Sequence, residues 1–298
     1  FLKQKKKNKN IILIVSKKLL QMQMKKLNFD YSINELDVKK IKLDKLQTNK
    51  INIVNVDFKF QKTFDKITNK SNNYIEKCFV VALELIKKYE FSGLINGPIS
   101  KKHFLQGKNL GITEYLAEKT KKNNDVIMLI YNKKLSVSPI TTHLALKDVH
   151  KNISKNKIYK HVRLIDEFYI KKFNKKPKIA ITGLNPHCES NFQNSEEDLI
   201  IIPAINKLKK KKFLVNGPFP ADTIFMKENF KSYDVVIGMY HDQVLSPMKS
   251  LFGFDAINIT LGLPFIRISP DHGPNSSMLG KNISNPKSLM EAFKFLDK

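Results

Sequence analysis

Short apolar runs alternate with helical patterns along the chain, and this alternation limits the possible folds more than any other feature. Residues 179–182 and 235–239 are apolar runs of strand length, whereas residues 72–89 and 157–173 place apolar side chains at helical spacing. Strands that alternate with helices form mostly parallel sheets, because each parallel connection needs a crossover. The sequence therefore predicts an α/β protein. Further elements are expected over residues 126–131 and 135–139 (a hairpin), 145–154 and 196–211 (helices).

Three histidines each follow an apolar, strand-like run. They are His143 after Thr141-Thr142, His187 after Asn185-Pro186, and His241 after Met239-Tyr240. Ligands of open α/β sheets bind beyond the carboxyl ends of the strands, and imidazole is the commonest metal ligand. A lone histidine of this kind is more often satisfied by the backbone, but three after separate strands favour a divalent metal site with an open position for substrate. His161, in helical and lysine-rich surroundings, is expected to be exposed.

Lys249, Asn258 and Arg267 lie near otherwise apolar segments, unlike most basic residues of the chain. A phosphate or carboxylate is the natural partner of such cations. Either cation alone is explained equally well by a structural ion pair. Lys249 and Arg267 together, beside the histidine cluster, favour an anionic substrate.

Basic residues are spread along the whole sequence, 53 Lys and Arg against 27 Asp and Glu, with a formal net charge of +26. Because they form no dedicated stripe, we expect no nucleic-acid partner. The apolar runs are too short to span a membrane, and no signal peptide opens the chain, so no membrane association is expected. Two cysteines, Cys78 and Cys188, provide no disulfide framework. These features favour a cytoplasmic protein.

A series of short motifs in a fixed order covers essentially the whole chain and resembles the 4-hydroxythreonine-4-phosphate dehydrogenase family. The motifs are Gly97-Pro98-Ile99, Thr141-Thr142-His143-Leu144, Asn185-Pro186-His187, Gly217-Pro218-Phe219-Pro220-Ala221-Asp222-Thr223, Met239-Tyr240-His241-Asp242-Gln243, Gly262-Leu263-Pro264-Phe265-Ile266-Arg267 and Asp271-His272-Gly273.

The resemblance implies a two-domain fold like that of isopropylmalate dehydrogenase, with mostly parallel sheets and an interdomain cleft. We expect a discontinuous first domain of residues 1–110 plus 270–298, and a second domain of residues 111–269 that carries most metal and substrate residues. The family's opening strand and its glycine-rich turn do not precede Phe1, so both are expected to be missing. A homodimer with a shared active site is also implied.

The implied reaction is the NAD-dependent oxidation and decarboxylation of 4-phosphohydroxy-L-threonine to 3-amino-2-oxopropyl phosphate, in the biosynthesis of vitamin B6 (pyridoxal 5'-phosphate). NAD and one divalent cation (Zn, Mg, Co or Mn) are the implied cofactors. The implied metal ligands are His143, His187 and His241. The implied substrate-binding residues are Thr113, Lys249, Asn258 and Arg267. Asp222 and Asp242 are the candidate catalytic carboxylates, and the sequence does not choose the base between them. The implied NAD-binding residues are His272, Gly273, Asn275, Lys281 and Asn285.

Two departures from the family pattern keep other functions open. Ile112 stands where the family has a histidine before Thr113, and Cys188-Glu189-Ser190-Asn191-Phe192 replaces the usual glycine-rich loop after His187. A dehydrogenase of the same fold that acts on D-threonate 4-phosphate or D-erythronate 4-phosphate is therefore the main alternative. A non-catalytic basic binding protein on the same scaffold is a remote alternative, and it would show neither metal dependence nor NADH formation.

Overall fold

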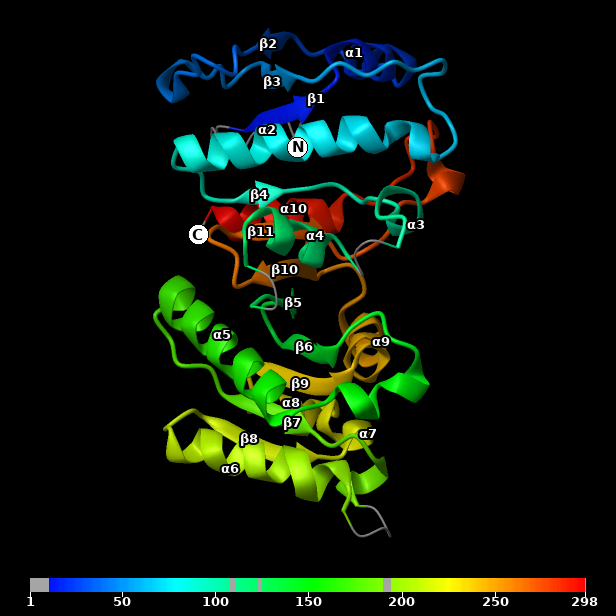
Figure 1. Cartoon of the computed structure of the whole chain (residues 1–298). Coiled ribbons are helices and arrows are strands. Elements are labelled where there is room, and N and C mark those ends of the chain that lie inside the picture. Colours follow the sequence, from blue (N-terminus) through cyan, green and yellow to red (C-terminus); the bar gives the residue numbers. More distant parts are fainter. Residues whose placement is uncertain (1–10, 108–110, 123–124, 190–193, 298) are drawn as a thin grey trace. The chain divides into compact units, whose positions relative to one another are not determined.

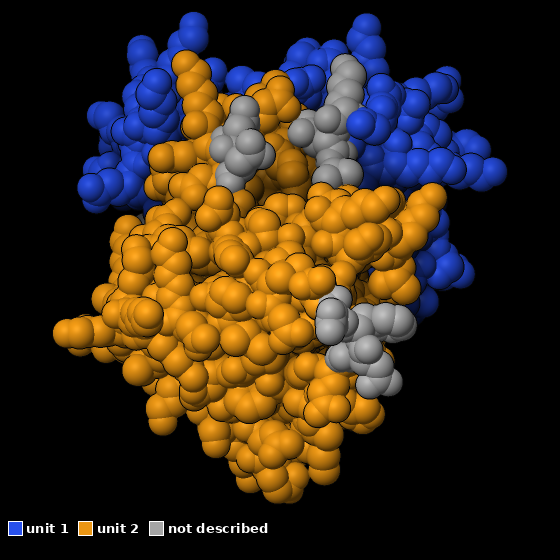
Figure 2. Space-filling model, turned by 60° about the horizontal axis from the view of Figure 1, so that its bottom comes forward, with its two compact units in different colours: residues 1–94, 98–107, 273–286 blue, residues 95–97, 108–272, 287–298 orange. Residues whose placement is uncertain are grey.

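The computed structural model describes residues 11–107, 111–122, 125–189 and 194–297, which form helices and two β-sheets (Figure 1). The chain divides into two compact units, coloured separately in Figure 2. Unit 1 comprises Phe1–Leu94, Pro98–Gly107 and Gly273–Pro286. Unit 2 comprises Ile95–Gly97, Lys108–His272 and Lys287–Lys298.

Unit 1 contains a three-stranded parallel sheet in the order β1-β3-β2. The strands are β1 (Ile12–Val15), β2 (Ile33–Glu35) and β3 (Ile51–Asn55). Leu85 of α2 (Asn72–Lys88) packs with Val54 of β3 and with Ile41, so the apolar face of the helix covers the sheet. The remaining elements are α1 (Lys17–Lys26), η1 (Leu43–Lys45), η2 (Asn69–Ser71), α3 (Lys101–Phe104) and η7 (Ser276–Met278).

Unit 2 is built on an eight-stranded sheet in the order β4-β11-β10-β5-β6-β9-β7-β8. The strands are β4 (Leu94–Ile95, of which Ile95 belongs to unit 2), β5 (Ile127–Tyr131), β6 (Ser136–Thr141), β7 (Ile179–Thr182), β8 (Val215–Phe219), β9 (Val235–Tyr240), β10 (Ile257–Leu261) and β11 (Arg267–Pro270). Neighbouring strands in the run β6-β9-β7-β8 pair in parallel. Neighbouring strands in the run β11-β10-β5-β6 pair antiparallel. The expected hairpin of β5 and β6 is confirmed, and most described pairings in the two sheets are parallel.

Alternate residues of the central strands face two helical layers. Ile179 and Ile181 of β7 pack in the same core as Ile158 of α5 (Lys155–Phe173). Ala180, between them, belongs to a second core with Val244 of α9 (His241–Phe252). Burial on both faces explains why these strands are apolar throughout. The other helices of unit 2 are α4 (Ile112–Lys119), α6 (Ile202–Lys210), α7 (Ala221–Ile224), α8 (Lys227–Phe230) and α10 (Lys287–Leu296).

The observed units differ from the expected domains at the C-terminus. Helix α10 belongs to unit 2, because Ala292 and Phe295 are part of the core that contains the central strands. Residues 273–286 belong to unit 1. Among the described helices, none is both long and apolar enough to cross a membrane.

Two expected helices have a different local structure. Residues 145–154 form two short 3₁₀ turns, η3 (Leu146–Asp148) and η4 (His150–Asn152). The segment 196–211 begins with a π-helical turn, η6 (Glu197–Ile201), before α6. Pro203 lies in the first turn of α6 and lacks the N–H that a continuous α-helix would need at that point. The break therefore follows from one residue inside an otherwise helical pattern.

His161 on α5 is buried and not exposed, so the expectation from its lysine-rich neighbourhood is wrong; only 4% of the residue is accessible. Its Nδ1 lies 2.9 Å from Ser138 Oγ, whose hydroxyl donates to the Met128 carbonyl. Since that hydroxyl hydrogen is already used, His161 Nδ1 must donate, which fixes the neutral Nδ1–H tautomer. Burial, aided by the charges of Lys160 and Lys157, lowers the pKa of His161 to about 3.

The depressed pKa of His161 predicts a loss of stability in mild acid. An unfolded histidine binds its proton below about pH 6.5, whereas the folded one does so only near pH 3, so acid favours the unfolded state. The free energy of unfolding should fall by about 1.4 kcal/mol per pH unit between about pH 6 and 4 from this group alone. His161→Asn, whose amide can still donate to Ser138, should reduce the slope by about that amount in urea unfolding series. The exposed His150→Asn is the control; equal slopes in both variants would contradict the prediction.

Candidate active site

The three strand-end histidines lie at one edge of the unit 2 sheet. Strands β6, β9 and β7 are parallel neighbours, so their carboxyl ends meet. His143 follows β6, His241 begins α9 directly after β9, and His187 lies in the short turn η5 (Pro186–Cys188) after β7. The ring centroids of His143 and His241 are 5.7 Å apart. The fold thus gathers residues that are far apart in the sequence.

Asp242 orients the ring of His241. Its Oδ1 lies 2.6 Å from His241 Nδ1, so Nδ1–H donates to the carboxylate and Nε2 keeps its lone pair. This is the arrangement in which an imidazole binds a cation through Nε2. The Asp242 side chain is itself largely exposed. Asp242 therefore acts on the ring of His241 in this structure.

The His187 ring does not join the other two. Within the described residues, no three His, Cys, Asp or Glu side chains are gathered closely enough to hold a metal ion. His187 is exposed, so packing against other side chains does not fix its rotamer. The structure therefore places all three residues at one edge and brings two of the rings together.

Asp222 lies near the His187 turn. It is an exposed residue of α7, a helix that contacts η5. Burial raises the pKa of Cys188, and the nearby negative charges of Glu197, Asp222 and Glu189 raise it further. Asp222 is thus close enough to act electrostatically on the residue next to His187.

Arg267 on β11 is a buried cation held by neutral oxygen atoms. It is 3% exposed, its Nε donates to Asn96 Oδ1 at 2.7 Å, and its Nη1 donates to Thr260 Oγ1 at 3.1 Å. Thr260 Oγ1 in turn lies 3.2 Å from Thr113 Oγ1. Burial lowers the pKa of Arg267 to about 10, and the charge of Glu114 opposes that change in part. A desolvated guanidinium with neutral partners is suited to an anionic ligand.

Asn258 shares a sheet face with this network. In the β10–β11 register it lies opposite Ser269, and Thr260 lies opposite Arg267, so side chains two residues apart point to the same side. The Oδ1 atom of Asn258 is buried and has no hydrogen-bond partner among the described residues. An unpaired buried acceptor is costly unless a ligand donor completes it.

Lys249 is paired with Asp271. Its Nζ donates to the Asp271 carbonyl at 2.5 Å and forms an ion pair with the Asp271 carboxylate. Burial raises the pKa of Asp271, although Lys249, His241 and His272 oppose that change. Lys249 lies on α9, the helix that begins at His241. The predicted substrate lysine is therefore already held in position.

Most of the predicted NAD-binding residues form an exposed loop of unit 1. Gly273, Asn275, Lys281 and Asn285 are exposed, and Asn275 Oδ1 accepts from the N–H and the hydroxyl of Ser277 at the start of η7. His272 belongs to unit 2, where its ring centroid is 6.1 Å from that of Phe254.

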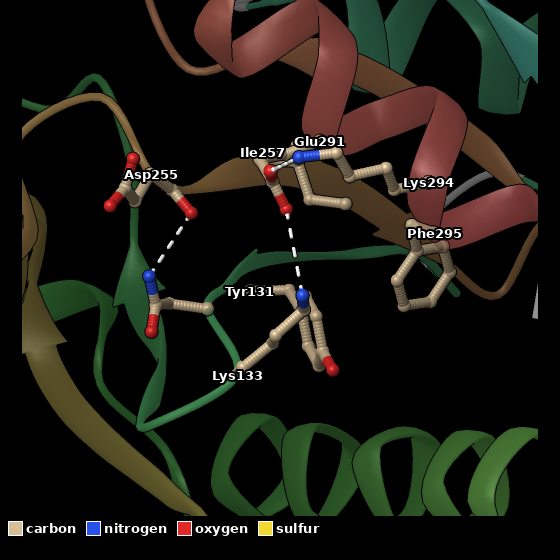
Figure 3. A pocket seen from close by; sticks show the side chains of 8 residues that line it. Tyr131, Lys133, Asp255, Ile257, Glu291, Lys294 and Phe295 are labelled. Carbon is tan, nitrogen blue, oxygen red and sulfur yellow. Dashed lines mark hydrogen bonds and ion pairs between the residues drawn. The ribbon is translucent and has the colours of Figure 1, made fainter. Parts of the chain in front are cut away.

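A small hollow in unit 2 is separate from these residues. Its lining side chains are shown in Figure 3, and Asn132 Nδ2 donates to the Asp255 carbonyl beside it at 3.0 Å. The space of about 20 Å³ is enough for one water molecule, and no predicted site residue lines it. The hollow is lined by Tyr131, Asn132, Lys133, Asp255, Ile257, Glu291, Lys294 and Phe295.

Sequence reasoning missed several residues that the structure places at the site. Thr260 could have been found, because it follows Asn258 at strand spacing. Gln243 lies two positions after His241, at the end of the motif Met239-Tyr240-His241-Asp242-Gln243. Asn96 and Glu197 carry no local signal, since only packing brings them to Arg267 and to the His187 turn.

Comparisons of the sequence and of the structure with known proteins lead to the same family. The family model described as "Pyridoxal phosphate biosynthetic protein PdxA" matches residues 7–296. A 4-hydroxythreonine-4-phosphate dehydrogenase of Sulfurihydrogenibium sp. (strain YO3AOP1) is 40% identical over 96% of this chain and 88% of the relative. An Oceanobacillus iheyensis protein, provisionally named D-threonate 4-phosphate dehydrogenase, is 34% identical over 94% of this chain and 86% of its own length. The crystal structure of 4-hydroxythreonine-4-phosphate dehydrogenase from Klebsiella pneumoniae matches with a TM-score of 0.82 at 26% identity, covering 97% of this chain and 88% of that one.

The surroundings of Arg267 predict that its charge costs stability. Replacing a buried, imperfectly paired cation with an apolar side chain of similar length is often neutral or stabilising. Arg267→Met should therefore leave the free energy of unfolding unchanged or raise it by about 1–2 kcal/mol in urea unfolding. The chain has one other arginine, Arg163, which forms salt bridges with Asp125 and Glu167 at the surface. Arg163→Met is the matched control, with an expected loss below about 1 kcal/mol. A loss of about 3 kcal/mol or more in Arg267→Met would instead identify a structural role.

Proposed function

The chain belongs to the PdxA family of 4-hydroxythreonine-4-phosphate dehydrogenases, and on this premise we propose the reaction that it catalyses. It oxidises 4-phosphohydroxy-L-threonine with NAD, and the resulting β-keto acid loses CO₂ to give 3-amino-2-oxopropyl phosphate for vitamin B6 biosynthesis. The reaction depends on a divalent cation. The observation that supports this best is the joint presence, in one unit, of the His143–His241 pair and the buried Arg267 network.

Three neutral imidazoles would hold the cation. Asp242 leaves Nε2 of His241 available, His143 is its neighbour, and His187 lies on the same sheet edge with an exposed ring. When bound, the cation would stabilise negative charge on the substrate oxygen that loses its proton. Asp242 is then a positioning residue for His241. Asp222, exposed near the His187 turn, is the carboxylate left to move a proton.

The polar residues of β10, β11, α4 and α9 would bind the substrate. Arg267 and Lys249 supply positive charge for its phosphate and carboxylate groups, and Thr113 adds a hydroxyl. Asn258 Oδ1 would accept a hydrogen bond from the substrate's amino or hydroxyl group, which would satisfy an otherwise unpaired atom. Charge and hydrogen bonding thus fit a small phosphorylated hydroxy acid.

We place NAD at His272, Gly273, Asn275, Lys281 and Asn285, with a homodimer as the active form. The exposure of this loop supports the cofactor assignment. Two unpaired cysteines fit the cytoplasmic location that we propose. The 34% identical relative keeps D-threonate 4-phosphate as a second candidate substrate.

Formation of NADH, followed by absorbance, tests the proposal. We expect turnover of 4-phosphohydroxy-L-threonine that a strong chelator abolishes and that an added divalent cation restores. His241→Ala should lower kcat/KM at least about 100-fold, because it removes a group that acts in the transition state. His150→Ala, at an exposed position, is the control.

Each alternative predicts a different result in this assay. Turnover that persists under strong chelation would refute the metal dependence. A higher kcat/KM with D-threonate 4-phosphate would favour the second substrate, and no NADH with either compound would favour a binding protein.

A further inference from the structure

The backbone of the His187 turn is unusual. His187 and Cys188 are consecutive non-glycine residues with positive φ angles of 56° and 58°. Left-handed backbone costs about 1–2 kcal/mol for such a residue and persists only where the surroundings hold it. The turn must therefore be stabilised by contacts outside itself.

Glu197 holds the two residues that lead into this turn, Leu184 and Asn185. Glu197 is 1% exposed, and its Oε1 accepts from the backbone N–H groups of Leu184 at 2.7 Å and Asn185 at 2.9 Å. Its Oε2 accepts from Asn185 Nδ2 at 2.8 Å. Burial raises the pKa of Glu197, but hydrogen bonds from Asn185 and Leu184 outweigh it and lower the net value, so the carboxylate is charged at neutral pH.

Gln243 holds Gly183, the residue that precedes these two. Its Nε2 donates to the Gly183 carbonyl at 2.9 Å. Its Oε1 accepts from Thr182 Oγ1 at 2.9 Å and from the Met239 N–H at 2.7 Å. Gln243 lies two residues after His241 in α9, so one side chain connects the end of β7, the end of β9 and the helix that starts with His241.

Two glycines leave the room that these side chains need. A Cβ atom on Gly183 would lie 2.9 Å from Glu197 Oε1, and a Cβ atom on Gly238 would lie 2.9 Å from Gln243 Oε1. Both distances are shorter than real Cβ contacts allow. The backbone approaches the two polar groups closely because no side chain intervenes.

We propose that Glu197 and Gln243 are positioning residues that fix the backbone of the His187 turn relative to the start of α9 at His241. Among the described residues, neither side chain has a hydrogen bond to a predicted substrate-binding residue. Both form hydrogen bonds with other residues of the protein. This proposal rests on the proposed function in one respect: His187 in this turn is taken to be a cation ligand. The fixed part is the backbone, and the exposed ring of His187 retains its rotation.

Amide hydrogen exchange of the metal-free protein tests the holding of the turn directly. Loss of one acceptor in Glu197→Gln should speed exchange of the Leu184 and Asn185 amides about 10-fold, and Glu197→Ala about 100-fold. Gln243→Glu, which places an oxygen against the Gly183 carbonyl, should also speed exchange in this turn. Glu196→Gln is the matched control, because Glu196 bonds the Asn185 side chain and not the turn backbone. Unchanged exchange in the Glu197 and Gln243 variants would overturn the proposal.

Titration of the metal-free protein with Co²⁺, followed by its visible absorption, tests the consequence for His187. Glu197→Gln and Gln243→Glu should bind Co²⁺ about 10–100-fold more weakly, with an altered spectrum, as expected for partners that orient a ligand. Faster exchange together with an unchanged Co²⁺ affinity and spectrum would overturn the positioning role. The two experiments separate this proposal from the proposed function: absence of Co²⁺ binding to the unaltered chain would refute the metal site, and the exchange data would still decide whether the turn is held.

Discussion

The parallel alignment of β6, β9 and β7 is the constraint on which the candidate site depends. The chain just beyond each of these strands carries one of the three histidines, and parallel neighbours place these positions at one edge of the sheet. The register is secure because the strands are buried on both faces. Shifting β7 by one residue would exchange Ile179 and Ile181 with Ala180 between two helical layers of different shape. Core packing therefore fixes the positions of the polar residues at the edge.

At the sheet edge, core packing supports the candidate site. Arg267, in contrast, is a charged residue inside the core. Nearly every basic residue of this chain is a lysine, yet among the described residues the buried one of this kind is Arg267. A guanidinium offers several donors in a fixed plane, whereas an ammonium group is more strongly hydrated and harder to bury. Asn96 and Thr260 use two of these donors, and the charge has no hydrogen-bonded carboxylate among the described residues. A buried cation that neutral partners hold in a fixed orientation is best explained by a ligand.

Local periodicity predicted the elements of this fold well, because helix α2 and the β5–β6 hairpin depend on residues close in sequence. Local periodicity failed where the environment of a residue depends on partners that are distant in the sequence. His161 appears solvated from its neighbours in sequence, but its partner Ser138 lies on another element. Glu197 lies in a sequence typical of an exposed helix surface, and yet its side chain is buried beside the residues that follow β7. The candidate site was predicted as a set of motif residues, and the side chains that hold those residues could be found only in three dimensions.

A rigid backbone with a movable ring suits a ligand such as His187. If the turn were loose, ordering the backbone of three residues on cation binding would cost about 3–6 kcal/mol, or roughly two to four orders of magnitude in affinity. Fixing a single side chain costs only about 0.5–1.5 kcal/mol. Glu197 and Gln243 order the turn when the chain folds, so that cost does not recur at binding. The exposed ring of His187 is then the part of this ligand that still has to be ordered when the cation binds.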